Sequence, residues 1–487
     1  MNQKITGGPL VDASRRSFLR RSAIGVLAAA CVPVSMTSSC AISGNPGKRP
    51  NIVMYISDDH GIDFLGCYGN KDIKTPNIDS LVKEGMLFSN VFAASPTCAP
   101  SRSVLWTGLY PARNGCMGNH TVCRNDVTSL PTYLGRLGYR VVLANKRHAR
   151  PKEVFCFEYI DAGLPRNPAN PRKYRREGLN IRAIDEFLSE HAKNRPETPL
   201  CLILGESSPH VTWEPNKTYD PAKLQLPPFI VDTELTRRAM ANYYQDITTM
   251  DRRVGQTRAM LKKYGFDDNT LFIYTTDQGS EWPHSKWTVY DTGIHVPFIA
   301  VWPGKIKPHS VCDAMISFVD ITPTFIDIAG GRQPEGLDGK SFLDVLLGKT
   351  KTFHKYIYAS HTRDGDMNVF PQRGVRDSRY KYILNLRPEN KWTTHFTKVP
   401  DIPESHKQVW DTWVEKAKVD TEVDKLLDII ERHPAEELYD LQTDTYELNN
   451  IADIPENRPV LREMREQLNK WMLSQNDPAL KAGNTNS

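Results

Sequence analysis

Carboxylate and amide side chains directly follow two short apolar runs of the sequence. Asp58 and Asp59 come after the run at residues 51–57, and Asp277 and Gln278 come after the run at residues 271–276. Together they offer an all-oxygen ligand set, which suits calcium, whereas magnesium prefers to keep several of its waters. Paired acids after a strand often form only a turn or a helix cap, so other residues must support a metal site.

Nucleophilic, basic and cationic side chains occur in four further segments. Residues 98–102 read Cys-Ala-Pro-Ser-Arg, and Thr107-Gly108 and Pro111 follow them. The other three segments contain Lys146 with His148, Pro209 with His210, and Lys286 in a stretch that ends at Pro297. A cysteine beside a turn proline is common by itself, so the whole set must be considered together.

In this order along the chain, the segments resemble the signature motifs of the formylglycine-dependent sulfatase family. The resemblance covers C-x-P-S-R and T-G-x-x-P, the two acidic pairs, the G-K-x-H element at residues 145–148, the Pro-His pair, the K-x-T-x-Y segment from Lys286 and the sequence Glu437-Leu438-Tyr439-Asp440. Details such as Pro151-x-Glu153 and Ser360-His361 are most similar to N-sulfoglucosamine sulfohydrolase, the heparan N-sulfatase.

The resemblance implies a reaction. A maturation enzyme converts the family's cysteine, here Cys98, to formylglycine, whose hydrate offers two hydroxyls. One hydroxyl attacks sulfur, and the other then loses its proton so that sulfate leaves. One Ca²⁺ lowers the pKa of the attacking hydroxyl, and Arg102 steadies the hydrate. The expected metal ligands are Asp58, Asp59, Cys98, Asp277 and Gln278.

Four further residues receive roles from the resemblance and from the charge of the substrate. A sulfate group is an anion, so lysine and arginine side chains must neutralise it beside the metal. His148 is the expected base that collapses the hydrate, with Lys146 holding the hydrate and a sulfate oxygen. His210 is expected to protonate the leaving group while Lys286 neutralises the sulfate, although the two assignments can be exchanged.

The expected substrate is a sulfated glycan, and specifically the N-sulfate of glucosamine at the end of a heparin or heparan sulfate chain. The alternative is an O-sulfate of glucosamine, N-acetylglucosamine or galactosamine. His361, Arg363 and Arg373 are the candidate substrate contacts. Arg363 lies in Thr362-Arg363-Asp364, where heparan N-sulfatases carry an acid after Ser-His. This difference indicates a changed or extended sugar preference.

Two departures from the family pattern lie next to the chemistry. Gln278 stands where asparagine or histidine is more common, and it still offers a carbonyl oxygen to a metal. Asn145 replaces the usual glycine before Lys146. We expect the first change to loosen the metal geometry and the second to alter the loop more than the chemistry.

Two other functions compete with a sulfatase. A phosphate or phosphonate ester hydrolase can share the fold and the metal cradle, but a two-metal phosphatase would need additional histidine and aspartate ligands that we do not find. A non-catalytic glycan-binding lipoprotein would leave Cys98 unconverted. Such a protein would have no need of the complete set Lys146, His148, His210 and Lys286.

An α/β fold must position these residues. Apolar runs at 51–57, 139–144, 200–205, 271–276 and 296–302 predict buried strands, and helical patterns lie between them at 76–85, 128–137, 180–191 and 235–264. Thr322 is expected to cap one more helix. The alternation predicts a large alkaline-phosphatase-like domain with a mainly parallel sheet flanked by helices, and ligands bind beyond the carboxyl ends of such strands. Short runs at 356–359 and 380–384 and a helix at 458–473 predict a smaller C-terminal α+β domain with an antiparallel sheet.

The first residues resemble a targeting segment. Arg15-Arg16 precedes an apolar stretch from Ala23 to Pro33, which fits a twin-arginine signal or an ordinary signal peptide, and Cys31 or Cys40 is a candidate for lipidation. We expect a signal segment at 1–48, a catalytic domain at 49–350 and a C-terminal subdomain at 351–487 that contributes to substrate binding. The protein would then be periplasmic or at the cell surface.

Composition narrows the partners. The chain has 62 basic and 57 acidic residues and a formal net charge of +5, without a basic arm, so no nucleic acid partner is expected. No later segment offers about twenty uninterrupted apolar residues, so membrane attachment would require a lipid anchor. The expected partners are a sulfated saccharide, the formylglycine-generating maturation enzyme and the export machinery.

Overall fold

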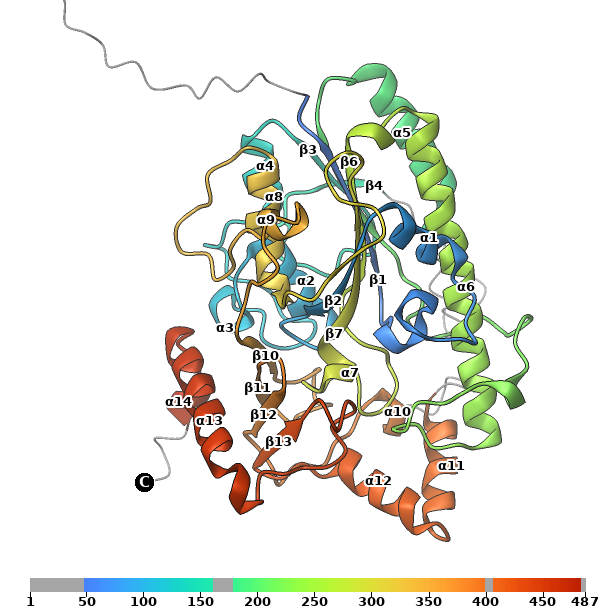
Figure 1. Cartoon of the computed structure of the whole chain (residues 1–487), viewed down its shortest axis with the longest axis vertical. Helices are drawn as coiled ribbons and strands as arrows, with labels where there is room; N and C mark the ends of the chain where they lie inside the picture. The colour runs from blue at the N-terminus through green and yellow to red at the C-terminus, as the bar shows by residue number, and fades with distance from the viewer. Residues whose placement is uncertain (1–47, 161–177, 399–405, 483–487) are drawn as a thin grey trace, which may run out of the picture. The chain divides into compact units, whose positions relative to one another are not determined.

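The computed structural model describes residues 48–160, 178–398 and 406–482 (Figure 1). The predicted signal segment, with Cys31 and Cys40, lies outside the described residues except for Lys48. In the part of the chain that is described, no helix combines the length and the apolar composition needed to cross a membrane.

A nine-stranded sheet forms the centre of the fold, in the order β4-β3-β5-β1-β6-β7-β2-β8, with β9 paired to β2. The pairs among β4, β3, β5, β1 and β6 are parallel, whereas β7 runs antiparallel to β6 and to β2. The predicted mainly parallel sheet is therefore confirmed. The strands are β1 (Asn51–Ser57), β2 (Met86–Phe92), β3 (Arg140–Asn145), β4 (Glu158–Ile160), β5 (Leu200–Gly205), β6 (Thr270–Thr276), β7 (His295–Val301), β8 (Ser310–Cys312) and β9 (Ile316–Ser317).

The central strand β1 shows why the sheet is buried on both faces. Ile52 and Met54 point into one apolar cluster, and the alternating Val53 and Tyr55 point into another. Helices cover both faces: α2, α4, α8 and α9 lie on one side, and α1, α5 and α6 lie on the other (Figure 1). Their bounds are α1 (Pro76–Glu84), α2 (Cys98–Thr107), α4 (Leu130–Arg136), α5 (Ile181–Asn194), α6 (Glu234–Lys263), α8 (Ile321–Ile328) and α9 (Leu343–Leu346).

Local capping explains where the long helices begin. The hydroxyl of Thr233 accepts the N–H of Thr236 at 3.1 Å at the start of α6, and the side chain of Asn180 accepts the N–H of Ala183 at the start of α5. The predicted cap at Thr322 is wrong, because α8 begins at Ile321 and the preceding residue is Asp320. A short 3-10 turn from Phe318 to Asp320 leads directly into this helix, so it starts earlier than the proline alone indicates.

A separate four-stranded antiparallel sheet follows, in the order β10-β11-β12-β13, as predicted. A small apolar cluster joins it to the large sheet: Phe92 and Tyr290 pack with Ile357 and Tyr439. The predicted domain boundary near residue 350 falls between α9 and β10 and stays a prediction. The remaining elements are β10 (Ile357–His361), β11 (Gln372–Arg376), β12 (Tyr380–Asn385), β13 (Glu436–Asp440), α3 (Pro111–Asn114), α7 (Asp291–Ile294), α10 (His395–Lys398), α11 (Lys407–Ala417), α12 (Thr421–Glu431), α13 (Arg458–Ser474) and α14 (Ala479–Ala482).

Candidate active site

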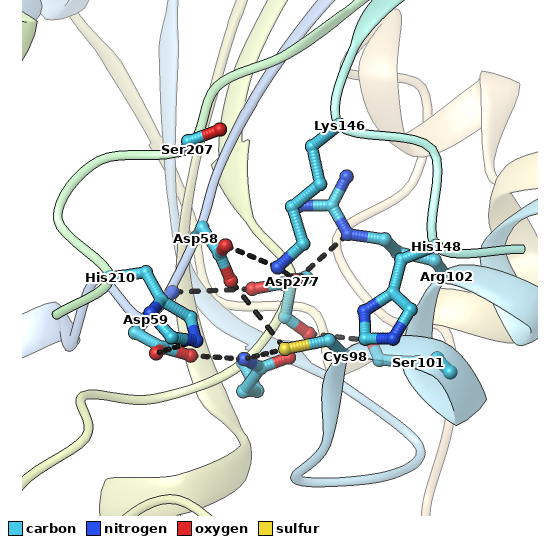
Figure 2. Close-up of polar contacts among 12 residues, drawn as sticks. Asp58, Asp59, Cys98, Ser101, Arg102, Lys146, His148, Ser207, His210 and Asp277 are labelled. Atoms are coloured by element: carbon cyan, nitrogen blue, oxygen red, sulfur yellow. Dashed lines mark hydrogen bonds and ion pairs between the residues drawn. The ribbon is translucent and has the colours of Figure 1, made fainter. Parts of the chain in front are cut away.

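Neighbouring parallel strands deliver polar side chains at their carboxyl ends. Asp58 and Asp59 follow β1, Asp277 follows β6, and all three carboxylates are fully buried. The N–H of Asp59 donates to Oδ1 of Asp277 at 3.3 Å, and Asp59 has a left-handed φ of +63°, which aspartate tolerates better than most residues. The fold therefore brings together the two acidic segments that lie far apart in the sequence (Figure 2).

Two lysines compensate these buried carboxylates. Nζ of Lys286 lies 2.7 Å from Oδ2 of Asp59. Lys146 pairs with Asp58, and its Nζ lies 3.7 Å from Oδ2 of Asp277. Burial lowers the pKa of Lys286, but the negative charge of Asp59 and its neighbours outweighs this effect and holds the pKa well above its ordinary value. The site therefore combines buried anions with buried cations at close range.

The carboxylates form a cluster that fits a divalent cation. Possible ligand atoms of Asp58, Cys98 and Asp277 lie within 4.8 Å of one another, and so do those of Asp58, Asp59 and His210. Buried charges of this kind are normally paired or bound to metals. His210 is a further possible donor that the sequence did not identify as a ligand.

Gln278 adds an amide to this cluster. Its Nε2 donates to Oδ1 of Asp59 and, at 3.2 Å, to Sγ of Cys98. Its Oε1 is buried and has no hydrogen-bond partner among the described residues. The amide nitrogen therefore faces Asp59 and Cys98, and half a turn of the amide would present the carbonyl oxygen there, a donor that a hard cation can use. All the predicted ligands thus gather in one place: Asp58, Asp59, Cys98, Asp277 and Gln278.

Cys98 is the first residue of α2 and has only 2% of its surface exposed. Its Sγ lies 3.5 Å from Oδ1 of Asp58. Burial raises the pKa of the thiol to about 12. The thiol is therefore neutral near pH 7 and poorly suited to nucleophilic attack in its unmodified form.

The spacing of the Cys-x-Pro-Ser-Arg segment places Cys98, Ser101 and Arg102 on the same side of α2. Residues three and four positions apart lie on the same side of a helix. Oγ of Ser101 donates to the carbonyl oxygen of Asp277 at 2.5 Å, and Nε of Arg102 donates to Oδ2 of the same residue at 2.9 Å. One turn of α2 therefore binds the residue after β6 and fixes Cys98 beside the carboxylates.

The loop after β3 carries Lys146 and His148. Asn145 has a φ of +65°, a left-handed conformation that asparagine adopts more readily than most other residues. The loop also passes close to β5, because a Cβ on Gly205 would lie 2.5 Å from the carbonyl oxygen of Lys146. Asparagine thus permits the turn for which a glycine was expected.

The imidazole of His148 lies on the same side of the cluster as Cys98 (Figure 2). Burial, followed by the nearby charge of Lys146, lowers the pKa of His148 to about 2, so the ring is neutral. Its Nε2 forms a 2.8 Å hydrogen bond with Nδ1 of His120. The sequence did not identify His120, because nothing in its neighbours indicates that the loop returns to this site.

His210 and Lys286 lie together near Asp59. Nε2 of His210 is 3.7 Å from Oδ2 of Asp59, and its Nδ1 is 3.7 Å from Oε2 of Glu281. Glu281 is buried. Although burial raises its pKa, the charges of Lys286 and His210 outweigh this effect and hold the pKa well below its ordinary value. The sequence analysis missed Glu281, which lies in the polar stretch after β6 but outside any recognised motif.

The three candidate substrate contacts lie in different environments. His361 is buried in β10, where its Nε2 lies 3.0 Å from the carbonyl oxygen of Asn368. Arg373 is buried in β11 and pairs with Asp477 at 2.5 Å. Arg363 is exposed, and its carbonyl oxygen accepts the N–H of Asn119. In the described part of the chain, the contacts of these three residues lie outside the carboxylate cluster, so their contact with substrate stays a prediction.

Comparison with known proteins gives a consistent result. The family profile described as Sulfatase matches residues 50–331, and the profile described as N-sulphoglucosamine sulphohydrolase, C-terminal, matches residues 280–414. An ulvan-active sulfatase of Formosa agariphila is 35% identical over 91% of this chain and 83% of its own length. The human N-sulphoglucosamine sulphohydrolase is 26% identical over 88% of this chain and 91% of its own length.

Solved structures share the fold. One of them holds its substrate, D-glucosamine-2-N,6-O-disulfate, and superposes with a TM-score of 0.66 at 21% identity over 89% of this chain and 99% of that chain. At this identity the likeness concerns the arrangement of the elements. It agrees with a large mainly parallel sheet followed by a small antiparallel sheet.

Proposed function

Because the chain belongs to the sulfatase family and is a hydrolase, we propose that it releases sulfate from a sulfated saccharide. The observation that carries the proposal is the position of Cys98 at the start of α2. Its Sγ lies 3.5 Å from Oδ1 of Asp58 and 3.2 Å from Nε2 of Gln278, inside a cluster of buried carboxylates and lysines. These groups provide a nucleophile position, a cation site and positive charge for an anionic substrate.

A calcium ion is the metal proposed for this cluster. Asp58, Asp59, Asp277 and the buried Oε1 of Gln278 are oxygen donors, and Cys98 contributes after its conversion. When bound, the ion supplies positive charge and lowers the pKa of a hydroxyl beside it. The all-oxygen character of the aspartate and glutamine ligands favours calcium over softer metals.

Conversion of Cys98 to formylglycine by a maturation enzyme would replace the neutral, poorly nucleophilic thiol with a group that can attack sulfur. The hydrated aldehyde would offer one hydroxyl that attacks sulfur as the sugar oxygen or nitrogen departs, and a second whose deprotonation would reform the aldehyde and release sulfate. Arg102 and Ser101 hold α2 against Asp277 and so keep position 98 at the cluster. Arg102 also adds a fixed positive charge at this side of the site.

The remaining polar residues divide between two sides of the cluster. Lys146 and the neutral His148 lie on the side of Cys98, where His148 would accept the proton from the second hydroxyl. His210 and Lys286 meet at Asp59, where His210 would donate a proton to the departing oxygen or nitrogen. Lys286 would neutralise the sulfate.

The sugar is proposed from the relatives. The C-terminal profile and the human relative support the N-sulfate of glucosamine at a heparin or heparan sulfate chain end. The relative from Formosa agariphila supports a second candidate, a sulfate of ulvan, and O-sulfated glucosamine or galactosamine remains a third. Arg363 and Asp364 replace the expected sequence after Ser360-His361, which favours a sugar preference different from that of the human relative.

Export and surface location belong to the same proposal. A sulfated polysaccharide is too large to reach an enzyme inside the cell unless it is first degraded. The predicted signal segment and the candidate lipidation sites at Cys31 and Cys40 fit an exported, periplasmic or surface protein. Cell fractionation of the producing organism tests this, and recovery of the intact chain with its first thirty residues in the cytoplasm would contradict it.

The direct test compares substrates side by side. We expect calcium-supported release of sulfate from N-sulfated glucosamine, with 6-O-sulfated glucosamine, sulfated ulvan oligosaccharides and a phosphate monoester assayed in parallel. Release from an O-sulfated sugar alone would support the proposed sulfatase reaction but replace N-sulfated glucosamine as the proposed substrate. Faster release of phosphate than of any sulfate would contradict the proposed function.

A further inference from the structure

We infer that His120 is a positioning residue that fixes the imidazole of His148, an inference that rests on the catalytic role proposed for His148. Nδ1 of His120 lies 2.8 Å from Nε2 of His148, and the two ring centroids are 4.7 Å apart with planes inclined by 41°. Nδ1 of His148 is buried and has no hydrogen-bond partner among the described residues. The contact with His120 is therefore the hydrogen bond that orients this ring.

His120 is itself held by a third group. Its Nε2 lies 3.5 Å from Oδ1 of Asp364, whose side chain is buried. Oδ2 of Asp364 accepts hydrogen bonds from Nδ2 of Asn119 at 3.0 Å and from Nε1 of Trp287 at 3.3 Å. The carboxylate is thus fixed by two donors while it faces the histidine. Asp364, His120 and His148 form a chain that ends at the side of the cluster where Lys146 and Asp58 act on the His148 ring.

The backbone of the loop around His120 is also anchored. The carbonyl oxygen of His120 accepts a 2.6 Å hydrogen bond from Nη2 of Arg150. The N–H of Asn119 donates to the carbonyl oxygen of Arg363, and Oδ1 of Asn119 accepts the N–H of Ala99, the residue after Cys98. The same loop therefore contacts the nucleophile helix, the loop of His148 and the segment after β10.

The backbone conformation supports a special role for this histidine pair. His120 has a φ of +62° and His148 a φ of +46°, both left-handed. Residues other than glycine adopt this region rarely, and when they do they are often found at functional sites. Both residues of the hydrogen-bonded pair therefore have an uncommon backbone conformation.

Two tautomers of the His120–His148 pair fit the contacts of His120. Oδ1 of Asp364 favours a hydrogen on Nε2 of His120, whereas Nδ2 of Asn119, 3.3 Å away, favours a lone pair there. In either case one hydrogen lies between Nδ1 of His120 and Nε2 of His148. The ring of His148 is held in both arrangements, but only the first leaves a lone pair on the buried Nδ1 of His148 that can accept a proton. The base role of His148 therefore requires that Asp364, and not Asn119, sets the tautomer of His120.

The competing explanation is that His120 is a surface residue without a role in the reaction. Its side chain is 59% exposed, so it contributes little to the core. This exposure makes the alternative easy to test, because removing the side chain should not unfold the protein. A surface role predicts no effect on turnover, whereas a positioning role predicts a specific loss in kcat.

The test uses two variants in the calcium-loaded, formylglycine-bearing protein. His120→Ala should lower kcat for sulfate release at least about tenfold and change KM less than about twofold, as expected when a supporting hydrogen bond is lost. His120→Asn should recover most of that loss, because its amide lies at the position of Nδ1 and asparagine tolerates a positive φ. The matched control is His309→Ala, since His309 is exposed and also left-handed, with a φ of +54°. It should retain wild-type kinetics.

Two results would overturn the inference: a kcat of His120→Ala within about twofold of wild type, or no recovery in His120→Asn. Crystal structures of the wild type and of His120→Ala give a readout independent of turnover. We expect the His148 ring to rotate in the variant, and an unchanged ring would also overturn the inference. If the wild type released no sulfate from any sugar, the proposed function would fail, and the ring orientation would still decide the role of His120.

Discussion

Nε of Arg102 lies 2.9 Å from Oδ2 of Asp277, and both side chains are completely buried. This contact joins the helix that begins at Cys98 to the acid that follows β6. Removing one partner of a buried ion pair leaves a charge without compensation, which costs about 3–5 kcal/mol. The pair therefore has a structural role in addition to its place in the site.

Arg102→Met should lower the free energy of unfolding by about 3–5 kcal/mol when calcium is chelated. The measurement is urea unfolding in the presence of a chelator, so that bound metal does not replace the lost charge. Arg379→Met is the matched control, because Arg379 pairs with Asp440 on the surface, where its side chain is 49% exposed. The control should cost less than about 1 kcal/mol, and equal losses in the two variants would contradict this account.

Calcium should stabilise the folded chain through Gln278. A ligand at a hundred times its Kd stabilises a protein by about 2.7 kcal/mol, so the Tm should rise when calcium is added to the chelated protein. Gln278→Leu removes the buried Oε1 and should reduce this rise. Gln333→Leu, at an exposed glutamine, should keep the full effect. An equal calcium response in Gln278→Leu and wild type would remove Gln278 from the metal site.

Stability should depend on pH through buried histidines such as His361. Burial lowers the pKa of His361 to about 4, whereas an unfolded histidine titrates near 6.5. The unfolded state therefore binds a proton first, and the folded state loses stability as pH falls from about 6.5 towards 4. Between pH 7 and pH 5 this group alone should cost about 2 kcal/mol.

His361→Gln should therefore lose about 2 kcal/mol less than wild type between these two pH values. Urea unfolding at pH 7 and pH 5 measures the difference, and comparing the two conditions removes any effect of the substitution that is independent of pH. His309→Gln serves as the exposed control and should follow the wild type. An unchanged pH dependence in His361→Gln would contradict the effect of burial.

Arg363 and Arg373 should respond differently to truncation. Arg373 on β11 forms a buried pair with Asp477, which follows α13, so Arg373→Ala should lower the free energy of unfolding by about 3–5 kcal/mol. Arg363 is exposed, so Arg363→Ala should leave stability within about 0.5 kcal/mol. If Arg363 contacts the sugar, KM should rise while stability stays constant. Wild-type KM in Arg363→Ala would remove it from the substrate site.

The sequence predicted which strand ends carry the proposed metal ligands, because these ligands directly follow apolar runs that are easy to recognise. β1 and β6 are continuous apolar runs, and Asp58, Asp59, Asp277 and Gln278 follow them directly, so the parallel sheet alone brings them together. β2 was missed because Ser89 and Asn90 interrupt its apolar residues, at the point where its pairing with β7 is irregular.

Long-range partners could not be predicted from local patterns. Arg373 and Asp477 are 104 positions apart and pair because α13, which precedes Asp477, packs on β11. His120 reaches His148 because its loop folds back between α2 and the segment after β10. No periodicity or spacing in the sequence indicates either contact. The sequence therefore could not predict which residues Arg373 and His120 would bind.

The state of residue 98 tests the central claim most directly. Peptide mass spectrometry of the protein from its native host should show an aldehyde in place of the Cys98 thiol, and the same preparation should release sulfate from a sulfated saccharide when calcium is present. Cys98→Ala should carry no aldehyde and release no sulfate. An unmodified thiol in a preparation that releases no sulfate would contradict the catalytic account and favour a protein that only binds glycans.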